Sequence, residues 1–138
     1  MSEDEAVLVI VDGANAVGSV PDGWWRDRRG AAVRLRDSLV PAATAGLPGL
    51  PGPVEIVLVV EGAARGVASV AGVRVETAPG SGDDLIAELA AGAAPDRECV
   101  VVTADRGLRQ RVEAYGARCV GPRTVRPPHR PGNESMSG

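Results

Sequence analysis

Residues 7–15, with the sequence VLVIVDGAN, constrain the fold more than any other part of the chain. Five consecutive apolar residues, most of them β-branched, predict a strand buried on both faces, as in parallel sheets covered by helices. Asp12 follows at the carboxyl end of this strand. Ligands of open α/β sheets bind outside the carboxyl ends of the strands, so we interpret Asp12 as the centre of a site. The alternative is that Asp12 only fixes a turn with Gly13.

The length and composition predict one aliphatic domain. The chain has 138 residues, with two Trp, one Tyr and no Phe, so its core must be built from Val, Leu, Ile and Ala. This length is sufficient for a single domain with a continuous core. We expect the domain to span residues 1–121. Residues 122–138 are rich in Pro and Arg and have no apolar run, and they are expected to form a disordered tail.

The basic residues exclude several kinds of chemistry. All 15 are arginine, and the one histidine, His129, lies in the Pro-rich tail. Without lysine, the chain has neither the phosphate-binding loop motif nor a Schiff-base mechanism. A lone histidine argues against a Ser-His-Asp triad and against a histidine metal cluster. The net charge of −3 decides little, because phosphate binding depends on where arginines cluster.

The sequence predicts a soluble, cytoplasmic protein without a membrane segment. Residues 2–5 are polar and mostly acidic, and the apolar run that follows is too short to span a membrane. Cys99 and Cys119 each open an apolar stretch. Such cysteines are mostly buried small hydrophobic side chains, so we expect them to be reduced.

Strand and helix patterns alternate along the rest of the chain, which predicts a parallel sheet with right-handed crossovers. We expect Asp83 to be a helix N-cap and Gly92 a C-cap. Residues 16–22 are expected to form a loop and residues 47–53 a mobile Pro/Gly-rich connection. The predicted strands are residues 54–60, 73–77, 99–103 and 117–121, and the predicted helices are residues 25–45, 83–92 and 106–115.

Acidic residues follow the predicted strands at several places. Glu61 ends the second strand, Asp83 and Asp84 open the helix after the third, and Asp105 follows the fourth. The carboxyl ends of parallel strands share one edge, so we expect these acids to lie near Asp12. Clustered carboxylates repel one another and have raised pKa values unless a cation is bound. Each acid also has a purely structural alternative, as a strand end or a helix cap.

An oxygen-only ligand set suits Mg²⁺ or Mn²⁺, which keep bound waters and contact phosphate oxygens. Two such ions about 4 Å apart can activate a water and stabilise the leaving oxygen of a phosphodiester. The acids therefore predict metal-dependent phosphodiester hydrolysis that uses no nucleophilic side chain.

Candidate substrate contacts surround the predicted acidic edge. Arginine makes bidentate contacts to phosphate, although every solvated cation of a lysine-free chain is an arginine. The adjacent Trp24 and Trp25 can stack on the bases of single strands, with the alternative that at least one packs beside the first helix. The arginine candidates are Arg26, Arg28, Arg29, Arg65 and Arg106.

Three motifs resemble the NYN branch of the PIN-like nucleases. Residues 12–15, DGAN, resemble the DGxN motif of this branch. Residues 82–87, GDDLIA, resemble its Asp-led helix start. Residues 102–106, VTADR, are similar to its fourth-strand [ST]xD motif, which the YacP-type ribonucleases have in a closely comparable form. The resemblance covers residues 6–121, in the right order and spacing.

The resemblance implies a PIN-like three-layer α/β/α sandwich with a five-stranded, mainly parallel sheet in the order 3-2-1-4-5. It also implies an endoribonuclease that uses Mg²⁺ or Mn²⁺ to cleave single-stranded RNA. The ribosome or another protein is a candidate partner. We expect the chain to act as a monomer or a homodimer.

By position, three acids match the metal-binding and catalytic residues of the family, and two side chains support them. The acids are Asp12, Asp83 and Asp105, and the supporting residues are Asn15 and Thr103. Two further acids are candidate metal ligands. Glu61 stands where YacP-like members usually have Asp, and Asp84 is the second acid of the helix-opening pair.

Two other functions stay open at this point. The first is a non-catalytic PIN-like module that binds RNA or a protein. The second is a nucleotide phosphohydrolase of the haloacid-dehalogenase type, which also places an Asp after its first strand. That class needs a second Asp two residues further on, where this chain has Ala14, and usually a lysine, which this chain lacks.

Overall fold

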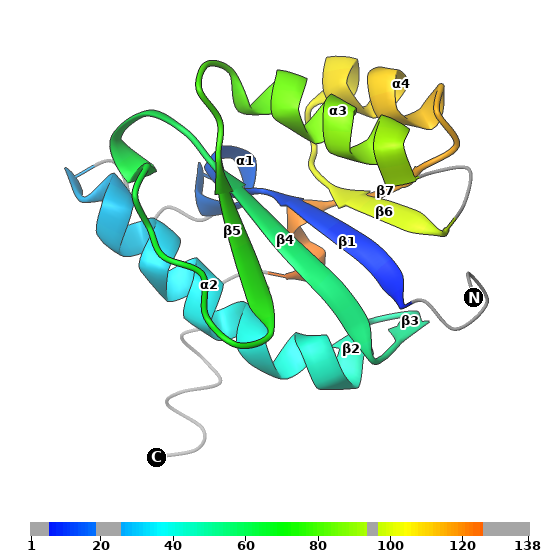
Figure 1. Ribbon diagram of the computed structural model, residues 1–138, viewed down its shortest axis with the longest axis horizontal. Helices are drawn as coiled ribbons and strands as arrows, with labels where there is room; N and C mark the ends of the chain where they lie inside the picture. The colour runs from blue at the N-terminus through cyan, green and yellow to red at the C-terminus, as the bar shows by residue number, and fades with distance from the viewer. Residues whose placement is uncertain (1–5, 19–25, 94–96, 126–138) are drawn as a thin grey trace, which may run out of the picture.

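The centre of the protein is one five-stranded parallel sheet (Figure 1). The computed structural model describes residues 6–18, 26–93 and 97–125. The strands follow one another in space as β5-β4-β1-β6-β7, and every neighbouring pair is parallel. Counted along the chain this is 3-2-1-4-5, which confirms the expected order. The strands are β1 (Val7–Asp12), β4 (Val54–Val60), β5 (Val73–Thr77), β6 (Cys99–Val102) and β7 (Arg118–Val120).

The register of the sheet brings the ends of β1, β4 and β6 to the same edge. Asp12, the last residue of β1, pairs with Val59 of β4, and Val11 pairs with Val102 of β6. The chain builds the sheet outward from β1 to β5 and then returns to place β6 on the other side of β1. The strand order therefore reverses beside β1, which is where ligands bind in sheets of this kind.

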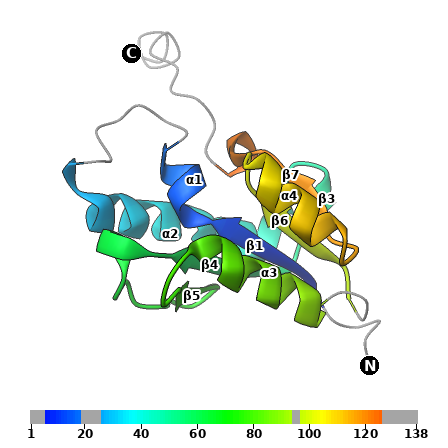
Figure 2. The same ribbon diagram turned by 90° about the horizontal axis from the view of Figure 1, so that it is seen from above.

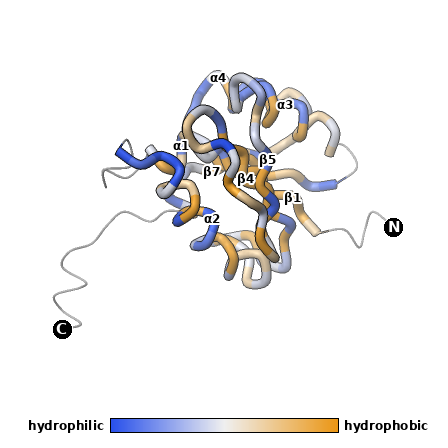
Figure 3. Tube along the Cα trace, turned by 60° about the vertical axis from the view of Figure 1, so that its left-hand side comes forward, coloured by the Kyte–Doolittle hydropathy of each residue, from blue (hydrophilic) through white to orange (hydrophobic). Residues whose placement is uncertain are grey.

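Helices cover both faces of the sheet because the β1 side chains alternate between two buried clusters. Val9 and Val11 pack with α1 and α2 on one face, whereas Leu8 and Ile10 pack with α3 and α4 on the other. Figure 1 shows these two helical layers, and in Figure 3 the central strands are largely hydrophobic whereas α4 is hydrophilic. The three-layer sandwich is thus confirmed. The helices are α1 (Gly13–Gly18), α2 (Arg28–Ala45), α3 (Gly82–Ala93) and α4 (Arg106–Glu113).

Two segments expected to be irregular have regular structure. Residues 13–18 form α1, which continues directly from the carboxyl end of β1 (Figure 2), in place of a loop from residue 16. The Pro/Gly-rich connection contains an antiparallel hairpin of β2 (Gly46–Leu47) and β3 (Leu50–Pro51). This hairpin is fixed because Gly46 and Gly49 supply positive φ angles and the side chain of Leu50 is buried.

The predicted caps and ends of the helices need correction at three points. Helix α2 begins at Arg28, after Asp27, whose side chain accepts a hydrogen bond from the Gly30 N–H at 2.9 Å. Helix α3 begins at Gly82, so Asp83 lies in its first turn, where its N–H donates to the Ser81 hydroxyl oxygen at 3.1 Å. Helix α3 also runs through Gly92 to Ala93.

The chain stays ordered beyond residue 121, where the tail was predicted to start. Pro122–Thr124 form the 3-10 helix η4, and the side chain of Pro122 is buried. Residues 126–138 lie outside the described residues. Within the part of the chain that the structure describes, no helix is long and apolar enough to cross a membrane.

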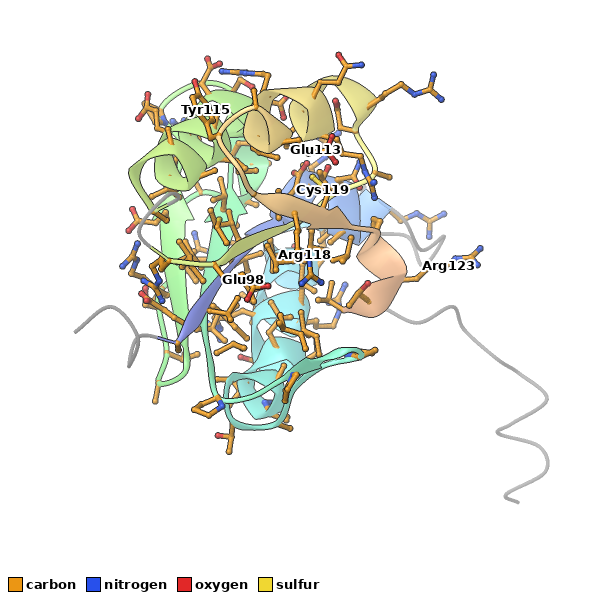
Figure 4. The ribbon with its side chains drawn as sticks, turned by 90° about the vertical axis from the view of Figure 1, so that its right-hand side faces the viewer. Glu98, Glu113, Tyr115, Arg118, Cys119 and Arg123 are labelled. Carbon is orange, nitrogen blue, oxygen red and sulfur yellow. The ribbon has the colours of Figure 1, made fainter. Side chains whose placement is uncertain are left out.

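Figure 4 shows the β7 edge of the sheet with Cys119, Arg118 and Glu98. Arg118 of β7 contacts Glu98, just before β6, with 2.8 Å between Nη1 and Oε2. Cys99 and Cys119 are both free. Burial raises the pKa of the Cys99 thiol to about 11, so this thiol is protonated and unreactive at neutral pH. Cys99 therefore acts as the small hydrophobic side chain that the sequence predicts.

Candidate active site

Asp12 is buried at the sheet edge, with 6% of its surface exposed. The chain passes close to β4 immediately after it, because a Cβ at Gly13 would lie 2.5 Å from the Val59 carbonyl oxygen. Asp12 Oδ1 accepts a hydrogen bond from the Asn15 N–H at 3.3 Å, so Asp12 does fix the following turn. Its second oxygen is used differently. Oδ2 accepts a hydrogen bond from the Thr103 hydroxyl at 2.8 Å, across the junction of β1 and β6.

Thr103 and Asn15 join the ends of β1 and β6 by hydrogen bonds. The fully buried Thr103 hydroxyl donates to Asp12 and accepts from the Asp105 N–H at 3.1 Å. Asn15 Oδ1 accepts a hydrogen bond from the Ala104 N–H at 2.9 Å. The orientation of the Asp12 carboxylate therefore depends on the ends of both β1 and β6.

Thr103 is itself held by a residue that the sequence patterns did not single out. Arg109 Nε donates a hydrogen bond to the Thr103 carbonyl oxygen at 3.0 Å. Arg109 lies in α4, where its spacing matched no motif. Only the packing of α4 over the end of β6 identifies it.

Glu61 connects the end of β4 with the start of α3. Its Oε1 atom accepts a hydrogen bond from the Gly82 N–H at 2.6 Å. A side chain at position 82 would collide with this carboxylate, because a Cβ there would overlap Oε1. Glu61 therefore closes the gap between two elements far apart in sequence, and this contact also brings Asp83 to the acidic edge.

Asp83 and Asp84 have different surroundings although they are adjacent. Asp84 points outward and forms an ion pair with Arg111 of α4, with 3.1 Å between Oδ1 and Nη1 and 69% of its side chain exposed. Asp83 is half-buried. The pKa of Asp83 is raised by burial first and then by the carboxylates of Asp105 and Glu61. The electrostatics therefore associate Asp83 with Asp105 and Glu61, whereas the Asp84 carboxylate is paired with Arg111.

The electrostatics of Asp12 lead to the same grouping. Burial raises its pKa, the hydrogen bonds from Thr103 and Asn15 lower it, and the carboxylates of Asp83 and Glu61 raise it further. Asp12 and Asp83 thus each sense the charge of Glu61. Four acids from four segments of the chain therefore interact electrostatically at the end of the sheet where β1, β4 and β6 finish.

Asp105 is a helix cap, which is the structural alternative given for it in the sequence. It caps α4, since its Oδ1 accepts a hydrogen bond from the Leu108 N–H at 2.9 Å. The charge of the same residue raises the pKa of Asp83, so Asp105 also interacts electrostatically with the acidic group. Among the described residues, no three Asp, Glu, His or Cys side chains converge on one point as metal ligands do.

The predicted substrate contacts are only partly within the described residues. Trp24 and Trp25 lie outside them. Arg28, Arg65 and Arg106 are exposed, and the Arg65 carbonyl oxygen accepts a hydrogen bond at 3.3 Å from the Arg29 guanidinium. Arg29 therefore binds the start of α2 to the segment after β4. Arg26 is exposed as well.

A cavity of about 170 Å³ opens on the face of the sheet that α1 and α2 cover, and sequence patterns gave no sign of it. Its walls come from α1, the start of α2, the end of β4 and the 3-10 helix η3 (Gly62–Ala64). No single segment contributes enough residues to form a recognisable motif. The lining consists mainly of small apolar side chains and backbone: Gly13, Ala14, Val17, Arg28, Ala32, Val60, Glu61, Gly62 and Ala64.

The three-layer sandwich with sheet order 3-2-1-4-5 is the fold that the resemblance to PIN-like nucleases implies. Among solved structures, the chain is similar to Rae1 (YacP) from Bacillus subtilis, in its W164L mutant, with a TM-score of 0.68. The match covers 86% of this chain and 71% of that chain, with 18% sequence identity, and at this identity it shows the fold alone. The sequence matches no family model and no curated protein. The resemblance to the YacP-like branch is therefore confirmed at the level of the fold.

The buried hydrogen bond between Thr103 and Asp12 gives a prediction for stability. Thr103→Val keeps the side-chain shape but leaves Asp12 Oδ2 without its donor, so we expect the free energy of unfolding to fall by about 1–3 kcal/mol. The pKa of Asp12 should rise further, because this hydrogen bond lowers it. Urea unfolding at neutral pH would measure the change. Thr103→Ser, which keeps the hydroxyl, is the control, and equal stability of the Val variant and the wild type would contradict the prediction.

Proposed function

We propose that the protein is a metal-dependent endoribonuclease that hydrolyses phosphodiester bonds of single-stranded RNA. One observation carries the proposal: carboxylates from four segments interact at the sheet edge where the strand order reverses. Such an edge is the usual ligand site of the fold class. Raised pKa values that arise from burial and like charges are typical of functional sites. The PIN-like fold and the three NYN-like motifs support the same activity.

The donor set fits a hard divalent cation, because it offers only oxygen atoms. Mg²⁺ is usually held by one or two carboxylates, several waters and substrate phosphates, so it does not need three converging side chains. Asp12, Asp83 and Asp105 would hold Mg²⁺ or Mn²⁺. Glu61 is a further candidate ligand, and its Oε1 atom already accepts the Gly82 N–H. When bound, the ion supplies an activated water and offsets charge on the leaving oxygen.

The hydrogen bonds around Asp12 favour the charged carboxylate that a metal ion would bind. The hydroxyl of Thr103 and the N–H of Asn15 stabilise the charged form of Asp12, which counteracts the burial of its carboxylate. No thiol competes as the nucleophile at the described acidic edge. Cys99 begins β6 at the opposite end from Asp105 and is buried. Water is therefore the nucleophile in the proposed reaction.

The proposed substrate contacts lie around the acidic edge. Arg28, Arg65 and Arg106 are exposed in the segments that follow β1, β4 and β6, where they would contact backbone phosphates. Trp24 and Trp25 precede the start of α2, and we retain the proposal that they stack on unpaired bases. Single-stranded RNA suits both kinds of contact, because its bases are free to stack.

Incubation of the full chain with end-labelled single-stranded RNA tests the proposed function. We expect endonucleolytic products with Mn²⁺ or Mg²⁺ and none in excess EDTA, because no described side chain at the edge can replace the metal-activated water. Restoring Mn²⁺ after EDTA should restore cleavage. Asp12→Asn, prepared in parallel, controls for contaminating nucleases. Cleavage that persists in EDTA would rule out the metal mechanism.

A non-catalytic PIN-like module that binds RNA or a protein is the second candidate. The observation in its favour is that no three described metal-ligating side chains converge on one point. This candidate predicts that RNA is retained by the protein with or without Mn²⁺ while its length stays unchanged. Filter binding and gel analysis of the same samples separate the two candidates.

A further inference from the structure

A groove of about 360 Å³ lies between α1 and η4, at the end of the sheet that carries the acids. Two of its lining residues are bound or adjacent to the groups that hold Asp12. The Asn15 N–H donates to Asp12 Oδ1, and Ala104 directly follows Thr103, whose hydroxyl donates to Oδ2. The groove therefore begins at the junction of β1 and β6. Its lining consists of Ala14, Asn15, Gly18, Ala104, Pro122 and Arg123.

The groove and the acids lie on different sides of these strand ends. Val120 and Val125, which flank η4, pack against the cluster under α1 and α2. Asp83 belongs to α3, which packs on the other face of the sheet. The groove is therefore not the place of the reacting phosphate. A substrate that occupies both sites crosses the ends of β1 and β6, so the group in the groove is a neighbour of the reacting one.

Arg123 gives this groove a positive charge. Among the described residues that line the groove, Arg123 alone is charged, and its side chain is exposed. Figure 4 shows it pointing away from the body of the protein, at the opposite end of β6 and β7 from Glu98. Two other exposed arginines are paired with acids, Arg118 with Glu98 and Arg111 with Asp84. Arg123 is placed to contact an anion from outside the chain.

The other walls of the groove suit a sugar-phosphate backbone better than a base. Asn15 Oδ1 accepts the Ala104 N–H at 2.9 Å, so the NH₂ group of Asn15 supplies the donors for a ligand. Ala14, Gly18 and Ala104 are exposed and have no side-chain hydrogen-bonding group. The described lining also has no aromatic ring on which a base could stack. Arginine and asparagine donors are typical contacts to phosphate oxygens.

We propose that this groove binds a backbone phosphate of the RNA next to the phosphate that is cleaved, with Arg123 as its cation, an inference that rests on the proposed function. The NH₂ group of Asn15 donates to the same phosphate. Because β6 and β7 lie on one side of β1 and β4 lies on the other, Arg123 holds the RNA on the β7 side of the acids. The contact is independent of base sequence, since phosphates carry no sequence information.

The salt dependence of RNA binding tests the contact without requiring cleavage. Labelled oligouridylate, an unpaired RNA, is titrated with the wild type and with Arg123→Gln in EDTA, from about 50 mM to about 200 mM salt. Each phosphate contact to a single strand contributes about 0.7 to the slope of log affinity against log salt concentration. We expect Arg123→Gln to bind about tenfold more weakly at low salt, with a slope shallower by about 0.7. Equal affinities and slopes, or no binding of the RNA by the wild type, would overturn the proposal.

Two further variants separate this contact from a general effect of charge. Arg118→Gln removes a charge of β7 that is paired with Glu98 outside the groove, so its affinity and salt slope should match those of the wild type. Arg123→Lys keeps the charge in the groove and should keep the salt slope. Thermal unfolding shows whether Arg123→Gln is folded, as expected for a change at an exposed side chain. Equal losses of affinity in Arg118→Gln and Arg123→Gln would overturn the groove as the site.

The length of the substrate distinguishes a neighbouring phosphate from the reacting one. The dinucleotide UpU has only the phosphate that is cleaved, whereas oligouridylate also has its neighbours. With Mn²⁺, we expect kcat/KM of the wild type to exceed that of Arg123→Gln about tenfold on oligouridylate, and the two values to approach equality on UpU. An equal ratio on both substrates would overturn the assignment to a neighbouring phosphate. If neither RNA is cleaved, the proposed nuclease function fails, and the salt dependence of binding decides about the groove.

Discussion

Asp12→Asn is expected to abolish metal-dependent RNA cleavage, with kcat/KM lowered by about a thousandfold or more. Asp12 lies at the centre of the acidic group, between Thr103 on one side and Glu61 and Asp83 on the other. A bound metal ion contributes several kcal/mol of transition-state stabilisation, and each ~1.4 kcal/mol is a factor of ten in rate. Single-turnover cleavage of labelled RNA measures the loss. A small loss, of about tenfold or less, would remove Asp12 from the proposed metal site.

The adjacent acids of α3 supply a matched comparison for the same experiment. Asp83→Asn removes a carboxylate that interacts with Asp105 and Glu61, and it should be nearly as damaging as Asp12→Asn. Asp84→Asn removes only an exposed ion pair with Arg111, so it should retain most of the activity. The reverse order of the two variants would show that Asp84 is the functional acid.

The apolar run of β1 was sufficient to predict both the strand and the place of Asp12. A run that is apolar at every position must be buried on both faces, and the structure divides Leu8 and Ile10 from Val9 and Val11 in this way. The same logic located β4 and β6, and with them Glu61 and Thr103. The full order of the sheet came from the resemblance to NYN proteins, because strand patterns alone do not say which strands are neighbours.

Local structure was predicted less well where several short signals compete. Asp83 was expected to cap α3, but the helix starts one residue earlier and the hydroxyl of Ser81 binds the Asp83 N–H. Ser and Asp are comparable caps, so the sequence SGDD does not decide between them. Helix α1 has only six residues, which is too short for a helical period to be visible.

The contacts across the site were beyond the reach of any sequence pattern. Glu61 binds the Gly82 N–H across 20 intervening residues, since the two positions differ by 21. The cavity combines residues of α1, α2, β4 and η3, and no one of these segments contributes a recognisable motif. The contact of Glu61 arises from the packing of α3 on one face of the sheet, and the cavity arises from the packing of α1 and α2 on the other, so both need a three-dimensional structure to be seen.

Asp83→Asn is expected to raise the melting temperature of the metal-free protein, although it removes a charge. Burial and the carboxylates of Asp105 and Glu61 raise the pKa of Asp83 above 3.8, the value for an unperturbed Asp. The folded state then binds the proton more tightly than the unfolded state. The contribution of Asp83 to stability is therefore fully present below pH 3.8 and is lost as the pH rises through the folded pKa.

The pH dependence of the melting temperatures of the wild type and Asp83→Asn tests the direction of this effect. Asparagine carries no charge at any pH, so in EDTA the advantage of Asp83→Asn over the wild type should grow from about pH 4 to about pH 7. Asp84→Asn is the control, because Asp84 shares the first turn of α3 but points to Arg111. If the two acids mainly stabilise the N-terminus of α3 by their negative charge, the free energy of unfolding should instead fall by about 0.3–1 kcal/mol in either variant.

Addition of Mn²⁺ separates repulsion within a metal site from repulsion among unrelated acids. A ligand that binds only the folded state stabilises it by RT ln(1 + [L]/Kd), about 2.7 kcal/mol at a hundredfold excess over Kd. The wild type and Asp84→Asn should show this gain, and Asp12→Asn and Asp83→Asn should show much less. Asp83→Asn should therefore be more stable than the wild type in EDTA and less stable than it in Mn²⁺. If Mn²⁺ raises the melting temperatures of all four proteins equally, the acids repel one another without sharing an ion, and the proposed metal site is wrong.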